Sequence, residues 1–194
     1  MTYQESGLEF SFDKSWVLKK YDEHPFYKSL SGASQKAVDF IGIWNNEILV
    51  LIEIKNYKIR YSDLKASPIE NILNEPEQFT SSIIQKVEDS LKAIDAINIY
   101  YNRQFWYRLF LPIIRLFKKS SADWPFWTQV YDIIDSEREV WVVLWFETED
   151  QQEQLRQNIK VRIKEGLDEF TDQIMICHQE EHPFGDTLQV KLID

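Results

Sequence analysis

Three charged residues, Asp39, Glu53 and Lys55, occur at a spacing that can assemble a metal-binding centre. They stand in two apolar segments separated by the turn-forming residues 45–47, Asn-Asn-Glu. A hairpin with a three-residue loop at this point places Asp39 directly opposite Glu53, with Cβ atoms roughly 5 Å apart. Because side chains alternate along a strand, Lys55 lies on the same face as Glu53. The hairpin therefore predicts two carboxylates and an ammonium group in one cluster.

Such a cluster suits metal-assisted hydrolysis. Two neighbouring carboxylates repel each other unless a proton or a cation lies between them. Mg²⁺ or Mn²⁺ is the natural cation for such a site, because both ions prefer oxygen ligands. Mg²⁺ also keeps several of its bound waters. A bound ion of this kind polarises a phosphoryl oxygen, and a nearby lysine can orient or deprotonate the attacking water. These are the requirements of phosphodiester cleavage.

The motif VDF at 38–40, then a turn, then an aliphatic strand that ends in EIK at 53–55, resembles the signature of the PD-(D/E)XK, or restriction endonuclease-like, nuclease superfamily. The resemblance implies that Asp39 and Glu53 bind Mg²⁺ or Mn²⁺ and that Lys55 serves catalysis. It also implies a DNA-cleaving enzyme, and a restriction endonuclease-like three-layer α/β sandwich with a mixed central sheet.

The same resemblance implies a further acidic residue on the first helix, for which Asp22 and Glu23 both qualify; we favour Glu23 as a catalytic residue. Val38 replaces the proline of the family name, and Gln85 resembles a glutamine of the following helix in some members. The matching segment covers under half of the chain.

The three charged residues also fit a purely structural role. A strand can end in Glu and Lys because it reaches solvent, and Asp39 could be a residue at the end of a β-ladder. A nuclease fold that has lost its activity could also act as a nucleic-acid-binding or protein-binding module.

Basic residues outside the motif are candidates for substrate binding. Lys58 and Arg60 follow the proposed centre and could contact phosphates, or they could be the solvated end of a strand. Residues 96–122 carry five basic side chains and no acidic one, interleaved with aromatic residues, and we expect Arg103 and Arg108 to border the cleft. Single-stranded nucleic acid, a membrane surface, a partner protein or a partly buried helix would each fit this segment.

The remaining pattern predicts a single α/β domain over residues 1–194, with a basic, aromatic insertion or helix near 103–119. We expect a helical region broken at Pro25, a loop or irregular helix ending at Pro76, a helix from Phe79 and a bend at 124–127. Further strands are expected at 139–148, 173–178 and 188–193, with a helix from Asp150 to Gly166.

Composition sets the broad class. The apolar fraction of 44% and the charged fraction of 28% are those of a folded protein. A net charge of −10 argues against bulk electrostatic coating of nucleic acid, although local positive charge can still hold a substrate. The single cysteine, Cys177, excludes an internal disulfide and a cysteine-rich zinc site. The first residues lack the features of a secretory signal, and no run is long enough to span a membrane, so we expect a cytoplasmic protein that could form a homodimer.

Overall fold

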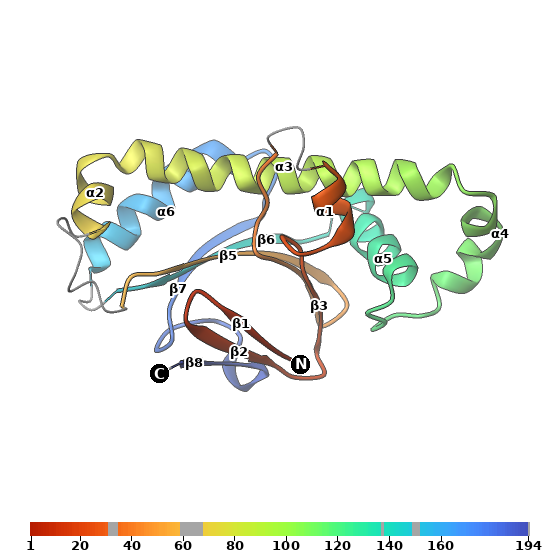
Figure 1. Cartoon of the computed structure of the whole chain (residues 1–194), viewed down its shortest axis with the longest axis horizontal. Helices are drawn as coiled ribbons and strands as arrows, with labels where there is room; N and C mark the ends of the chain where they lie inside the picture. The colour runs from red at the N-terminus through yellow and green to blue at the C-terminus, as the bar shows by residue number, and fades with distance from the viewer. Residues whose placement is uncertain (31–34, 59–67, 137, 149–151, 194) are drawn as a thin grey trace.

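The structure is a computed structural model that describes residues 1–30, 35–58, 68–136, 138–148 and 152–193. It confirms a mixed α/β architecture built on a five-stranded sheet of order β3-β4-β5-β6-β7 (Figure 1). The strands of this sheet are β3 (Trp16–Lys20), β4 (Phe40–Trp44), β5 (Ile48–Asn56), β6 (Val140–Glu147) and β7 (Gln173–Cys177). Antiparallel pairs join β3, β4 and β5, whereas β5, β6 and β7 run parallel, so the sheet is mixed.

The β4–β5 hairpin has the predicted register. Trp44 pairs with Ile48, and Phe40 pairs with Ile52. The loop is possible because Asn45 and Asn46 both adopt positive φ angles, of 52° and 63°, which asparagine tolerates better than most residues. The next position along the ladder brings Asp39 and Glu53 together at the open end of the hairpin.

Helices cover one face of the main sheet (Figure 1). They are α1 (Pro25–Leu30), α2 (Pro68–Asn74), α3 (Pro76–Asn102), α4 (Phe105–Ile114), α5 (Asp123–Asp135) and α6 (Glu153–Leu167). The apolar residues that repeat at helical spacing in the predicted helix from Phe79 are Ile83, Val87, Leu91 and Ile94; in α3 Leu91 is partly buried and the other three are buried against the sheet and the neighbouring helices. None of the helices in the described ranges is both long and apolar enough to cross a membrane.

A second, three-stranded sheet lies on the opposite face (Figure 1). It consists of β1 (Thr2–Glu5), β2 (Leu8–Phe12) and β8 (Leu188–Leu192), in the order β1-β2-β8, with the short 3₁₀ helix η2 (Gly185–Thr187) before β8. Aromatic rings fill the space between the two sheets: the ring of Phe10 lies 6.2 Å from that of Phe40 and 5.3 Å from that of Trp145. The segment 188–193 is therefore a strand as predicted, but it belongs to this second sheet.

Two local predictions near the chain start and middle were wrong. The region 14–31 is not helical throughout, because residues 16–20 form the edge strand β3 and pair with β4. Pro25 begins α1 rather than breaking a helix, a position that suits its missing amide hydrogen. The segment 124–127 is no bend; it lies in the first turns of α5, where Pro125 is also tolerated.

The segment 61–76 is only partly described, since residues 59–67 lie outside the described ranges. Residues 68–74 form α2, and Pro76 starts α3 instead of ending a loop. The basic, aromatic segment forms α4, which follows the C-terminal end of α3 and lies at the opposite end of that helix from α2 (Figure 1).

The packing between the sheets gives a stability prediction. Phe10 is fully buried, so replacing it with alanine should lower the free energy of unfolding by about 3–5 kcal/mol, through lost apolar burial and the cavity left behind. The matched control is Phe105→Ala in α4, where the phenyl group is 62% exposed; it should change stability by less than about 0.5 kcal/mol. Urea denaturation measures both, and equal losses would show that β2 does not pack as described.

Candidate active site

The alternation of β5 decides which face carries the candidate site. Leu49 and Leu51 point into the core beneath the helices, and Glu53 and Lys55 continue the same row toward the end of the strand. Beside them, Oδ2 of Asp39 accepts a hydrogen bond of 2.6 Å from the backbone amide of Ile54. The predicted trio therefore lies on one face of the sheet, at the C-terminal end of β5.

Glu53 is the centre of this group and is completely buried. Its Oε1 lies 2.7 Å from Nζ of Lys55 and 2.7 Å from Nζ of Lys86. Both lysines remain partly accessible, with side chains 31% and 23% exposed. Oε2 of Glu53 is also buried but has no hydrogen-bond partner among the described residues.

Sequence reasoning missed Lys86. It lies on α3, three residues after the buried Ile83 and one before the buried Val87. Helical spacing from Ile83 and Val87 places Lys86 at the border of the buried stripe, close to the sheet. This spacing is the sequence signal from which the position of Lys86 could have been inferred.

Asp39 is almost completely buried, and its ionisation is strongly perturbed. Burial, followed by the neighbouring Glu53 carboxylate, raises the pKa of Asp39 to about 7, while Lys86 and the amide of Ile54 act in the opposite direction. At neutral pH this carboxyl group is thus poised between its protonated and charged forms. Such a group responds readily to a proton or a cation placed between it and Glu53.

The residues present fit a magnesium ion better than a soft metal. Oε2 of Glu53 has no hydrogen-bond partner among the described residues. In Asp39 the hydrogen bond from the Ile54 amide goes to Oδ2, which leaves Oδ1 outside that bond. Within the described part of the chain, no group of three or more His, Cys, Asp or Glu side chains is arranged to hold a metal. A two-carboxylate set leaves the other positions to backbone oxygen or water, as Mg²⁺ accepts and structural zinc does not.

The third acidic position differs from the favoured prediction. Glu23 is 63% exposed and pairs with Lys20 at 2.7 Å; Lys20 also pairs with Glu5 of the second sheet. The structure therefore groups Lys86, and not Glu23, with Asp39 and Glu53. Asp22 is more buried than Glu23, and burial raises its pKa, but the charges that act on it are those of Lys20, Glu5 and Glu23. Both acidic residues precede α1 rather than lying on it.

The structure separates Lys58 from the cluster. Its Nζ lies 2.8 Å from Oε2 of Glu147, a fully buried carboxylate whose Oε1 accepts hydrogen bonds from the Trp145 indole and the Gln179 amide. Trp145 belongs to the core between the two sheets, so Lys58 neutralises a carboxylate on the face opposite Glu53. Lys58 was therefore misassigned as a residue at the cleft edge, and Arg60 lies outside the described residues.

Arg103 and Arg108 do not border the cluster either. Arg103 caps the C-terminal end of α3, and Arg108 follows on the exposed side of α4. At roughly 1.5 Å per helical residue, Arg103 is about 25 Å along the axis from Lys86. The prediction failed because a continuous helix, Pro76–Asn102, carries the basic segment away from the end of β5 where the carboxylates meet.

An open pocket of about 640 Å³ lies beside the cluster. Its lining includes Tyr57, the next residue after Lys55 on the same face, and Gln85, the residue before Lys86. Lys36 adds a basic side chain, Glu75 adds an acidic one, and Ser81 and Ser82 add hydroxyl groups.

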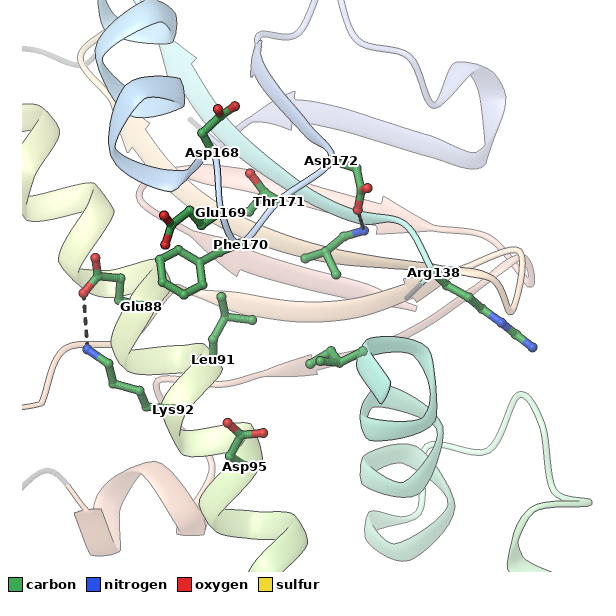
Figure 2. A pocket seen from close by; sticks show the side chains of 12 residues that line it. Glu88, Leu91, Lys92, Asp95, Arg138, Asp168, Glu169, Phe170, Thr171 and Asp172 are labelled. Atoms are coloured by element: carbon green, nitrogen blue, oxygen red, sulfur yellow. Dashed lines mark hydrogen bonds and ion pairs between the residues drawn. The ribbon is translucent and has the colours of Figure 1, made fainter. Parts of the chain in front are cut away.

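A different pocket, of about 420 Å³, lies at the other end of the parallel strands. Figure 2 shows Glu88, Lys92 and Asp95 of α3 facing Asp168 and Glu169, which follow α6. Lys92 pairs with Glu88 at 3.2 Å, as the sequence predicts. The lining of this acidic pocket includes Val140, which begins β6, and does not include Asp39, Glu53, Lys55 or Lys86.

No family model matches this chain, and no curated protein and no solved structure matches it significantly.

The raised pKa of Asp39 gives a stability prediction with a definite sign. Between about pH 4 and pH 7 the folded protein retains a proton on Asp39 that the unfolded chain, with the ordinary pKa of 3.8, has lost. Ionisation of this residue therefore lowers the free energy of unfolding as pH rises through that window. Asp39→Asn removes this effect and can still accept the Ile54 hydrogen bond.

The Asp39→Asn variant should gain stability over the parent as pH rises from about 4 to 7, by more than about 1 kcal/mol in total, and the difference should level off above about pH 8. Urea denaturation without divalent cations measures it. If the difference in the free energy of unfolding between the variant and the parent does not change with pH, the raised pKa of Asp39 would be contradicted.

Proposed function

We propose that this protein is a Mg²⁺- or Mn²⁺-dependent DNA phosphodiester hydrolase of the PD-(D/E)XK type. The observation that carries the proposal is the convergence of Asp39, Glu53, Lys55 and Lys86 on one face of the sheet, with two buried carboxylates beside two partly accessible ammonium groups. A group of this kind is costly to bury without a compensating function or partner.

The proposal extends to the fold. Support comes from the order of strands, in which an antiparallel pair, β4–β5, carries the carboxylates and a parallel strand, β6, follows after a long helix. A restriction endonuclease-like assignment would count the helices, the mixed sheet and the material on its far face as three layers. In this chain the far face is covered by the three-stranded sheet β1-β2-β8.

In the proposed reaction, Asp39 and Glu53 hold the cation through their oxygens that lie outside the hydrogen bonds described above. The bound cation supplies polarisation of the phosphoryl oxygen and acidity of a bound water. Lys55, as the ammonium group that pairs with Glu53, would orient the attacking water, and Lys86 would offset the negative charge that builds up in the transition state. Glu53 directs both lysine side chains to the same place, because each ammonium group lies 2.7 Å from its Oε1.

DNA would approach through the pocket beside Tyr57 and Gln85, whose lining carries one basic side chain, Lys36, and one acidic side chain, Glu75. This entry differs from the basic segment 96–122, which the sequence suggests as the binding surface. Because the chain has a net charge of −10, the positive charge that holds the polyanion would come from the partly accessible Lys55 and Lys86.

Replacement of the lysines tests the activity. Lys55→Ala and Lys86→Ala should each lower the rate of Mg²⁺-dependent cleavage of linear and circular DNA by at least about 100-fold, because each removes a charge beside the reacting phosphate. The control is Lys92→Ala on the same helix, whose exposed ammonium group pairs with Glu88 and whose loss should leave the rate unchanged. Circular dichroism verifies that all three variants fold.

Glu53→Gln completes the set, since it keeps the shape of the side chain and removes its charge. Cleavage that survives in this variant and in Lys55→Ala at the rate of the parent would refute the nuclease proposal. Cleavage that requires no divalent cation, measured with and without a chelator, would refute the metal-dependent part of it.

A second candidate function rests on a specific observation. Lys55 and Lys86 both close onto Oε1 of Glu53, so the cluster can also be a permanent buried ion-pair network that holds α3 against β5. The fold would then serve as a nucleic-acid- or protein-binding module without catalysis. DNA binding without cleavage in any divalent cation, together with a large loss of stability in Lys86→Ala, would favour this candidate.

A further inference from the structure

Helix α4 is apolar on almost all sides, although only part of it is buried. Its sequence, FWYRLFLPII, contains a single charged residue, Arg108. Tyr107 and Ile114 are buried and Leu111 packs against the core, so this side attaches α4 to the domain. A helix that is apolar all round is normally enclosed by protein or by lipid. In the described part of the chain, the remaining sides of α4 face solvent.

The exposed large apolar side chains of α4 and of the residues on either side of it are together called the apolar end face. Figure 1 shows α4 at the end of the molecule farthest from α2. The face consists of large apolar residues from the end of α3, from α4 and from the turn that follows it: Ile99, Tyr100, Phe105, Trp106, Leu109, Phe110, Ile113, Leu116 and Phe117. Exposed apolar surface of this extent marks a binding site in most soluble proteins.

Charge indicates what binds there. Residues 96–122 carry five basic side chains and no acidic one, so the rest of the chain carries −15. Arg115 is neutralised by Asp132, through contacts of 2.8 and 3.1 Å, but the other four basic residues, Arg103, Arg108, Lys118 and Lys119, are exposed around the apolar end face. A basic surface on an otherwise acidic protein thus surrounds a large exposed apolar surface.

We propose that the apolar end face docks onto the surface of an anionic lipid bilayer, with α4 lying in the plane of the interface. Exposed tryptophan, phenylalanine and leucine side chains enter the boundary between headgroups and acyl chains, and flanking Arg and Lys contact anionic headgroups. The ten residues of α4 are too few to cross a bilayer, which takes about 20. This inference does not depend on the proposed nuclease activity.

The same observations disfavour two other occupants. A symmetric dimer through the apolar end face would bring the same basic patch of two chains together, and the like charges would repel. Single-stranded nucleic acid stacks its bases on aromatic rings, and four of the nine residues of the face, Ile99, Leu109, Ile113 and Leu116, are aliphatic and offer no stacking surface. A lipid surface satisfies both the aliphatic and the basic residues.

Vesicle flotation with the full chain tests the inference. The parent protein should bind vesicles of phosphatidylcholine containing about 30% phosphatidylglycerol, and bind pure phosphatidylcholine at least about tenfold more weakly. Trp106→Gln/Phe110→Gln should reduce binding to the anionic vesicles by about tenfold or more, because two large apolar side chains no longer enter the bilayer. Both positions are exposed, so folding should be unaffected, as circular dichroism can verify.

Two further variants isolate the causes. Phe170→Gln is the matched control, since Phe170 is exposed to a similar degree as Phe110, 47% against 41%, but lies after α6; it should bind like the parent. Arg103→Gln/Arg108→Gln should weaken binding to anionic vesicles by about tenfold and reduce its dependence on salt. DNA affinity and molecular mass are measured on the same variants.

Two outcomes would overturn the proposal. The first is a parent protein that floats with neither kind of vesicle; a dimer, or DNA binding, that the same Gln replacements abolish would then identify what covers the apolar end face. The second is vesicle binding that Trp106→Gln/Phe110→Gln leaves unchanged.

Discussion

The two-sided burial of β5 is the constraint on which the rest of the structure depends. This strand lies in the middle of the main sheet, between β4 and β6, with helices on one face and the second sheet on the other. Its side chains therefore alternate between two separate cores, and a shift of one residue would exchange them. The loop through Asn45 and Asn46 fixes the register and so determines that Glu53 faces α3.

The consequence is that the carboxylates at the ends of β5 and β6 are held away from bulk water. Glu53 on the helix face and Glu147 on the opposite face are both fully buried, and both are neutralised by lysine. Their surroundings differ in a way that matters for chemistry. Each carboxylate has a buried Oε2 that forms no hydrogen bond among the described residues, but Oε2 of Glu147 lies 2.8 Å from Nζ of Lys58. In Glu53 both lysines approach Oε1 instead, and the neighbouring carboxyl group of Asp39 has a raised pKa. The proposed cation site rests on this difference.

The long helix α3 links two ends of the molecule with different character. Near its start, Lys86 completes the charged cluster at the end of β5. At its far end, Arg103 begins the basic and apolar surface around α4. Since the helix is continuous, a partner bound at α4 would hold the Glu53 cluster at a fixed distance from that partner. The proposed catalytic centre and the proposed docking surface therefore use different residues of the chain.

Local sequence determined the parts of this protein that rest on short-range rules, whereas tertiary structure decided everything that depends on distant contacts. Alternation and turn chemistry were sufficient to predict the β4–β5 hairpin, its register and the approach of Asp39 to Glu53, because all three depend on neighbouring residues. The stripe of Ile83, Val87 and Ile94 was likewise sufficient to predict α3.

The distant contacts explain each prediction that failed. The strand β3 forms where the residues alone suggested a helix, because the edge of β4 offers it hydrogen bonds that outweigh local propensity. The placement of β8 beside β2, and the pairing of Lys58 with Glu147, join residues far apart in the chain. The length and direction of α3 bring Lys86 to the cluster and carry Arg103 away from it. The sequence pattern predicts that the helix forms but not the direction in which it runs across the sheet.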